Sequence, residues 1–200
     1  MLLALGVIAL IFFLMRGCNN DKGKEGATDS TSASTSSTGT TTDATGARGL
    51  AWGDVDFNAP AAAYEEITDK NIDIRGNNNY GIYGLGENIL FDEGKNTIRK
   101  DAEQNLKQIT TSIEKRYKGG EVRVFGYTDA IGSAGYNKEL AEQRATAVRD
   151  WLVKNGSISE DRISIEPVGE ARPVASNSTE QGRQQNRRVE IVAKPGKNNG

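Results

Sequence analysis

A polar run divides this chain of 200 residues into a short apolar start and a longer, regularly patterned part. The run covers residues 19–49 and consists mainly of Ser, Thr, Gly, Asp and Ala, as in TDSTSASTSSTGTTTDATGA. It has too little apolar surface to offset the entropy that a chain loses on ordering. We therefore expect residues 19–49 to form a disordered linker, with an end-to-end distance on the order of 30 Å.

The chain begins with an apolar run, MLLALGVIALIFFLM, at residues 1–15. A membrane-spanning helix needs about 20 apolar residues, so this run is short for one. Two interpretations stay open for residues 1–18: a membrane anchor helix, or a lipoprotein-type signal that ends at a lipidated Cys18. The lipoprotein signal fits Gly17 but not Arg16, and the A-x-A-like site of a cleaved secretory peptide is missing. Both open interpretations tether the chain to a membrane.

The overall charge and the rare residue types exclude several function classes. The formal net charge is −2 at pH 7, so the chain lacks the basic footprint of a nucleic-acid-binding protein. It contains no histidine and a single cysteine, which excludes histidine-based triads, histidine metal sites and an internal disulfide. We expect no cofactor and no bound metal.

Residues 50–79 are mixed in composition and carry no motif. Their larger apolar side chains can dock onto the part of the chain that follows, so we expect a partly ordered lead-in segment. These side chains are Trp52, Val55, Phe57, Tyr64 and Ile67.

Beyond residue 80 the pattern becomes regular. An apolar residue recurs every three or four positions from Ile98 to Tyr117, as on one face of an amphipathic helix that Gly119 ends. A second helix is expected to begin with Asn137 as its N-cap and to stop at Gly156. The predicted strands are 80–91 (one or two short strands), 121–128, 163–165 and 188–192, and the predicted helices are 98–117 and 137–155.

The order of these elements, β-α-β-α-β-β, indicates the fold class. It predicts an α/β sandwich in which two helices cover one face of a mixed sheet. We place this domain at residues 80–195 and a disordered tail at 196–200.

One arginine of the second helix has an unusual position. Arg144 lies in an apolar row with Leu140 and Val148, at a spacing of four residues. Burying an unpaired guanidinium is costly, so Arg144 needs an anionic partner, and Asp129 is the nearest candidate along the sequence. Three outcomes stay open at this point: a ligand bound by both residues, a plain ion pair between them, or Arg144 reaching out to solvent.

Three segments carry a resemblance to a known family: ILFDEGKNTIRKDAEQNL, GYTDAIGSAGYNKELAEQRATAV and GEARPVASNSTEQGRQQNRRVEI. Through them, residues 89–192 resemble the OmpA-like domain, the C-terminal peptidoglycan-binding domain of outer membrane protein A. The peptidoglycan-associated lipoprotein and the flagellar stator B-subunit share this domain. The chain departs from the family pattern at Gly94 and Ile131, where relatives often carry polar side chains.

The resemblance implies a site for the stem peptide of peptidoglycan, centred on its diaminopimelate residue. In the family, the aspartate of the T-D step and the helix arginine hold this zwitterionic group, and here these residues are Asp129 and Arg144. Asn137 is implied to add an amide and Arg187 a second basic contact, while Asn186 is expected to fix a loop. Three residues on neighbouring loops are implied to supply walls and main-chain hydrogen bonds: Phe91, Asp92 and Thr128.

We therefore predict a non-catalytic protein that binds stem peptides non-covalently and tethers a membrane to the cell wall. Residues 1–15 would hold the membrane, with the domain in the periplasm; the family favours the outer membrane, and an inner-membrane anchor is also compatible. An envelope protein–protein interaction module stays open as the alternative. A stator-like anchor is disfavoured because residues 1–15 contain no acidic residue, and a glycan hydrolase because no carboxylate pair has a suitable spacing.

Overall fold

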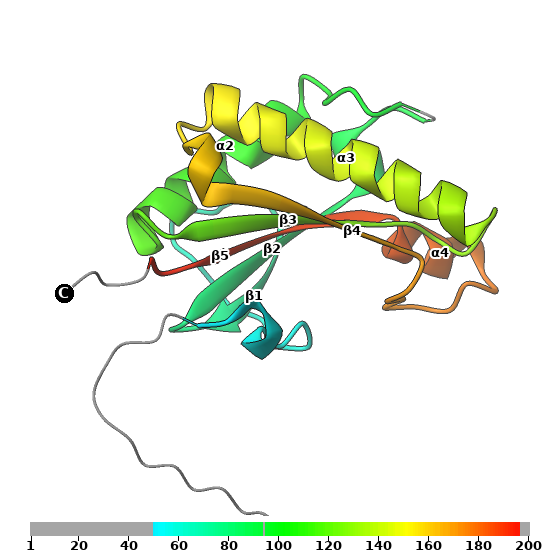
Figure 1. Cartoon of the computed structure of the whole chain (residues 1–200), viewed down its shortest axis with the longest axis horizontal. Helices are drawn as coiled ribbons and strands as arrows, with labels where there is room; N and C mark the ends of the chain where they lie inside the picture. The colour runs from blue at the N-terminus through cyan, green and yellow to red at the C-terminus, as the bar shows by residue number, and fades with distance from the viewer. Residues whose placement is uncertain (1–49, 94, 197–200) are drawn as a thin grey trace, which may run out of the picture. The chain divides into compact units, whose positions relative to one another are not determined.

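The computed structural model describes residues 50–93 and 95–196 (Figure 1). The expected anchor or signal at 1–18, the linker at 19–49 and the tail from residue 197 onward lie outside these described residues.

Five strands form the sheet of the described part: β1 (Asp73–Asn77), β2 (Tyr80–Gly86), β3 (Glu121–Tyr127), β4 (Ile163–Gly169) and β5 (Arg188–Lys194). Their order across the sheet is β1-β2-β5-β3-β4. β3 and β4 run parallel, whereas the other neighbours are antiparallel. The sheet is therefore mixed, as the sequence predicted.

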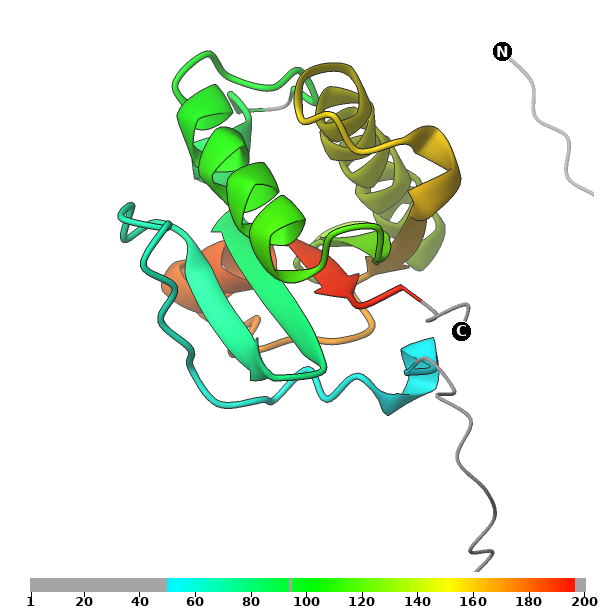
Figure 2. The same cartoon turned by 90° about the vertical axis from the view of Figure 1, so that its left-hand side faces the viewer.

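The helices within the described residues are α1 (Glu87–Leu90), α2 (Ala102–Arg116), α3 (Ala134–Asn155) and α4 (Glu180–Asn186), with two 3-10 helices, η1 (Trp52–Asp54) and η2 (Glu160–Arg162). α2 and α3 lie side by side on one face of the sheet (Figure 2). This arrangement confirms the predicted layer of two helices over a mixed sheet.

The apolar stripe predicted at 98–117 becomes the buried face of α2, because its central side chains pack in the main core. The helix begins at Ala102, later than predicted, because Ile98 pairs with Phe91 in an isolated β-bridge. The central side chains of the stripe are Leu106, Ile109 and Ile113, each 0% exposed.

The segment that precedes the sheet covers the face opposite the helices. Trp52, Val55 and Phe57 pack there in a second apolar cluster with Phe125 of β3 and Val192 of β5. The rings of Phe57 and Phe125 meet edge to face, with centroids 4.9 Å apart. Both faces of the sheet are therefore covered, and the beginning of the described chain is part of the fold.

The structure differs from the sequence-based prediction at two places around β2. β1 was not predicted, because its sequence DIRGN has no apolar alternation, yet it pairs antiparallel with β2. The sheet therefore begins before residue 80. Residues 87–90 were assigned to a strand but form α1, because β5 begins opposite Gly86 and leaves no strand to pair with the residues beyond it.

α3 lies close to β3 because of one glycine. A Cβ atom on Gly126 would lie 2.1 Å from the carbonyl oxygen of Ala141, so the two backbones can meet only where no side chain intervenes. The N-cap of α3 is Ser133, whose hydroxyl accepts from the amide of Tyr136, and not Asn137 as predicted. Asn137 lies one turn inside the helix, where its side-chain amide has a different partner.

Candidate functional site

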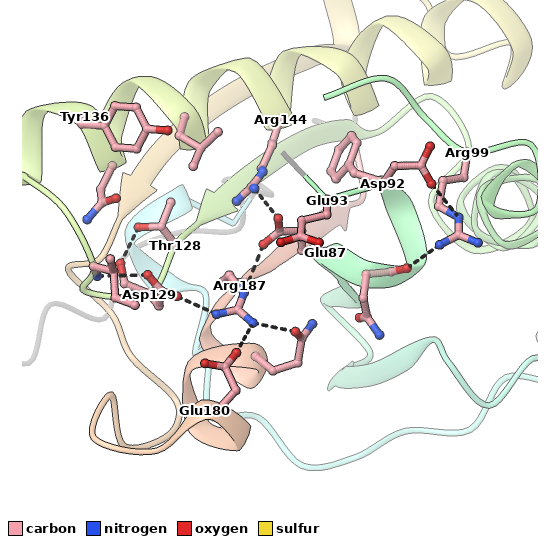
Figure 3. Close-up of a pocket in the computed structure, with 16 residues that line it drawn as sticks. Glu87, Asp92, Glu93, Arg99, Thr128, Asp129, Tyr136, Arg144, Glu180 and Arg187 are labelled. Carbon is pink, nitrogen blue, oxygen red and sulfur yellow. Dashed lines mark hydrogen bonds and ion pairs between the residues drawn. The ribbon is translucent and has the colours of Figure 1, made fainter. Parts of the chain in front are cut away.

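A pocket of about 810 Å³ opens where β2 and β3 end and β5 begins (Figure 3). Glu87 follows β2, Asp129 lies just beyond β3 and Arg187 precedes β5, so the antiparallel pairing of these strands brings the three residues together. α3 supplies a wall. The lining includes all seven residues proposed from the resemblance: Phe91, Asp92, Thr128, Asp129, Asn137, Arg144 and Arg187.

Arg144 is deeply buried, with 4% of its surface exposed. Its Nη2 donates to Oε1 of Glu87, whereas its Nε and Nη1 have no acceptor among the described residues. Burial lowers the pKa of Arg144 from its usual value, and the charge of Glu87 opposes that shift. The guanidinium therefore keeps unused donors inside the pocket.

The prediction that Asp129 is the partner of Arg144 was wrong, because Asp129 pairs with a different arginine. Nη1 of Arg187 donates to Oδ2 of Asp129 at 2.6 Å, and Arg144 pairs with Glu87 instead. Figure 3 shows Arg144 reaching from α3 toward Glu87 at the end of β2. Nearness along the chain pointed to Asp129, but the order of strands in the sheet decides which carboxylate lies beside the arginine.

Arg187 connects three carboxylates of the pocket. Besides Asp129, it contacts Oε1 of Glu180 at 2.8 Å and Oε2 of Glu87 at 3.4 Å. Burial disfavours its charge, but the hydrogen bonds to Glu180 and Asp129 outweigh that effect and raise the pKa of Arg187. The same contact lowers the pKa of Glu180. Arg187 is therefore a fixed cation at the base of the site.

The loop after β3 fixes the position of Asp129. Its Oδ1 accepts from the amide of Ile131 at 3.0 Å, and Thr128 Oγ1 donates to its carbonyl oxygen at 2.9 Å. The amide of Thr128 donates to the carbonyl of Gly169 at 3.0 Å, which joins the loop to the end of β4. Asp129 is 7% exposed, and its carboxylate oxygens have lone pairs left for a ligand donor.

Two buried amides hold the surroundings of the pocket in place. Asn137, 1% exposed, donates through Nδ2 to Oε2 of Glu170 and so ties α3 to the loop after β4. Asn186, 0% exposed, accepts from the amides of Val174 and Ala175 at 2.8 and 2.9 Å. The loop-fixing role expected for Asn186 is confirmed, and Asn137 lines the pocket with its amide nitrogen already engaged.

The outer end of the pocket carries looser charges. The side chain of Asp92 is 58% exposed and lies 3.8 Å from Nε of Arg99 and 3.7 Å from Nζ of Lys95. Phe91, next to it, is 1% exposed and supplies an apolar wall. Because exposed ion pairs contribute little stability, we expect Asp92 and Arg99 to rearrange readily around a ligand.

Several residues that line the pocket were not predicted from the sequence. Glu87 stands directly after a strand, as Asp129 does, so the rule that found Asp129 also applies to Glu87. The others have no comparable signal, because they lie on a helix or loop whose place beside the pocket depends on the fold. The missed residues include Glu87, Glu93, Arg99, Tyr136 and Glu180.

The lining places positively and negatively charged side chains close to one another. Such a site suits a zwitterionic group, whose carboxylate can meet an arginine while its ammonium meets a carboxylate. Within the described residues, no group of three His, Cys, Asp or Glu side chains is arranged to hold a metal ion. The described helices include none with the length and apolar character needed to cross a membrane.

The fold and the site together define an α/β domain that carries a charged pocket at its strand ends. Residues 90–187 match the OmpA family, so this part of the chain is an OmpA-family domain. The resemblance stated from the three sequence segments is thereby confirmed.

Known relatives match about half of the chain. Outer membrane porin F of Pseudomonas aeruginosa is 38% identical over 102 residues, which cover 51% of this chain and 29% of the relative. The probable lipoprotein YiaD of Escherichia coli is 39% identical over 114 residues, which cover 57% of this chain and 51% of the relative. The matched part therefore spans about half, or less, of the length of these relatives.

A solved structure shares the fold. The cell wall anchor of the T6SS from Pseudomonas aeruginosa superposes with a TM-score of 0.56 at 27% identity. The superposition covers 63% of this chain and 89% of that one. The mixed sheet with its helices is therefore the α/β architecture of this relative.

Proposed function

We propose that this protein holds a membrane to peptidoglycan by binding the stem peptides of the wall non-covalently. The OmpA-family domain is the binding part and lies in the periplasm of a bacterial envelope. Residues 19–49 act as the spacer and residues 1–15 as the membrane attachment. The observation that carries the proposal is Arg144, a buried arginine with unused donors in a pocket rich in carboxylates.

The ligand group that fits this pocket is the zwitterionic end of diaminopimelate. Its carboxylate accepts from one of the two donors of Arg144, Nε or Nη1, that have no acceptor among the described residues. Its ammonium donates to Asp129 and to Oε2 of Glu87, which has no hydrogen-bond donor among the described residues. Each ligand charge then meets an opposite charge that is largely withdrawn from water, where such attraction is stronger.

The names of the relatives support this proposal. The structural relative is a cell wall anchor, and the sequence relatives are an outer membrane porin and a probable lipoprotein. A wall-binding domain joined to different membrane attachments accounts for both kinds of relative. Binding of this kind breaks no bond, so the proposal assigns no catalytic residue.

The test is co-sedimentation of the full-length chain, kept in mild detergent, with purified peptidoglycan that contains diaminopimelate. Wild-type protein is expected in the pellet. Arg144→Ala is expected in the supernatant, because loss of a buried charge contact costs about 2–5 kcal/mol. Arg149→Ala is the matched control, since Arg149 also lies on α3 but pairs with Asp150 at the surface.

Thermal melts of the three proteins separate loss of binding from loss of fold. A folded wild type that stays in the supernatant would contradict wall binding itself. Retention of Arg144→Ala in the pellet at the level of the Arg149→Ala control would contradict the assigned site.

A further inference from the structure

Exposed apolar side chains gather at the rim of the pocket. Among the described residues, three large hydrophobic side chains are more than half exposed: Ile131 at 62%, Tyr136 at 60% and Val174 at 57%. Ile131 and Tyr136 both line the pocket, whereas Val174 does not. An exposed aromatic ring beside a polar site is a common place for ligand contact, because it offers apolar area at little entropic cost.

The position of Tyr136 at the start of α3 is set by local contacts of the backbone. Its amide donates to Oγ of Ser133, the N-cap of α3, which fixes the first turn of the helix. The ring lies beside Gly132, where a Cβ atom would come within 3.4 Å of Cδ1 of Tyr136. Gly132 has φ of +102°, so this turn requires glycine and leaves the ring room to lie against the loop.

Tyr136 shares one row of α3 with the arginine of the site. Tyr136, Leu140 and Arg144 follow each other at intervals of four residues, and all three line the pocket. At 1.5 Å per residue, the row extends about 12 Å from Tyr136 to Arg144. The wall therefore runs from an exposed aromatic ring, past an apolar side chain, to a buried charge.

We propose that Tyr136, together with Ile131, which also lines the pocket, forms a subsite for the amino sugar that carries the stem peptide. The proposal rests on the proposed function, in which Arg144 holds the diaminopimelate residue. Roughly three residue lengths of extended stem, about 10 Å, separate that residue from the sugar, which matches the length of the row. The C–H face of a pyranose ring packs on the exposed face of Tyr136, while its hydroxyl groups stay in water.

The polarity of the bound stem follows from this arrangement. The sugar end lies over the first turn of α3, and the diaminopimelate residue lies two turns further along the helix. The peptide beyond it then points toward the looser pair of Asp92 and Arg99 at the outer end of the pocket. The domain would thus recognise a stem that is still joined to its glycan strand.

The test compares two soluble probes by calorimetry with the full-length chain in detergent: a diaminopimelate-containing stem peptide, and the same peptide joined to its amino sugar. Wild type is expected to bind the sugar-linked probe about threefold to tenfold more tightly, the range for one aromatic contact. Tyr136→Ala is expected to bring this ratio close to one, and Tyr136→Phe to keep most of it. Val174→Ala, an exposed apolar residue outside the pocket, is the control and keeps the wild-type ratio.

The outcomes separate this inference from the proposed function. Equal affinity of wild type for the two probes overturns the sugar subsite and leaves stem binding intact. A Tyr136→Ala variant that keeps the wild-type ratio overturns the role of this residue. Failure of wild type to bind either probe overturns the proposed function and the subsite with it.

Discussion

Arg144 and Glu87 form an ion pair inside the pocket although 57 positions separate them in the chain. Only 5% of the side chain of Arg144 and 14% of that of Glu87 is exposed. Glu87 comes from the end of β2 and Arg144 from α3, so the pair joins the sheet to the helix layer. Each of the two buried charges is stabilised by the opposite charge of the other side chain.

Removing the charge of Glu87 is expected to destabilise the fold. Glu87→Gln leaves Arg144 buried without its charged partner, and breaking a buried pair in this way costs about 3–5 kcal/mol. Urea unfolding of the variant and of wild type measures the loss. The double variant Glu87→Gln/Arg144→Gln is expected to lose less than the sum of the two single variants. Strictly additive losses would mean that the two charges do not depend on each other.

Whether the stem peptide contains diaminopimelate or lysine should decide how tightly the protein binds the wall. Lysine lacks the second carboxylate of diaminopimelate, so walls built with lysine leave the donors of Arg144 without a ligand acceptor. We expect at least tenfold weaker co-sedimentation with such walls, since removal of a buried charge partner costs about 2–5 kcal/mol. Arg144→Ala should bind both wall types equally poorly. Equal binding of wild type to both walls would argue against a carboxylate held by Arg144.

The contact of α3 with β3 depends on Gly126. In Gly126→Ala, the new Cβ would meet the carbonyl oxygen of Ala141, so α3 has to move away from the sheet. We expect a loss of about 1–3 kcal/mol in unfolding free energy, and weaker wall binding because α3 carries Arg144. Urea unfolding and co-sedimentation check the two effects.

Gly135→Ala is the matched control for Gly126→Ala. Gly135 lies in the first turn of α3, but a Cβ atom there would meet nothing within 4 Å. Alanine favours helix over glycine, so this variant should be as stable as wild type or slightly more stable. An equal loss in both variants would show that the close approach is not the cause.

The elements with a strong apolar period could be predicted from the sequence. The stripe that became the buried face of α2 and the alternation in β3 both reflect which side chains must leave water. β1 could not be predicted, because its residues DIRGN are mostly polar and it forms by pairing with the edge of β2. The N-cap of α3 was misplaced because Ser133 and Asn137 are both good caps, and only the turn at Gly132 decides between them.

The partners within the site could not be predicted from nearness in the sequence. Asp129 and Arg144 do line one pocket, yet each has another charge as its partner, Arg187 and Glu87. Those pairings follow from the strand order, in which β5 lies between β2 and β3. A sequence pattern shows which charges need partners, while the topology of the sheet decides which ones they find.

Glu66 links the segment before β1 to α2 through hydrogen bonds. Its Oε1 accepts from Nε of Arg116 at 2.5 Å and from Oγ of Ser112 at 2.7 Å. The hydrogen bond from Arg116, more than any other contact, lowers the pKa of Glu66 from 4.5 to about 2. The folded state therefore favours the charged carboxylate more strongly than the unfolded state does.

This shift predicts how the contribution of Glu66 depends on pH. Because the pKa of Glu66 is lower in the folded protein, its contribution is complete above pH 4.5 and is lost as the pH falls toward about 2. Urea unfolding of wild type and Glu66→Gln from about pH 6 downward should show a stability difference that shrinks below pH 4.5. Glu65→Gln, a change at the exposed neighbouring carboxylate, should follow wild type throughout. A Glu66→Gln difference that stays constant down to about pH 2 would mean that the carboxylate is not held by Arg116 in its charged form.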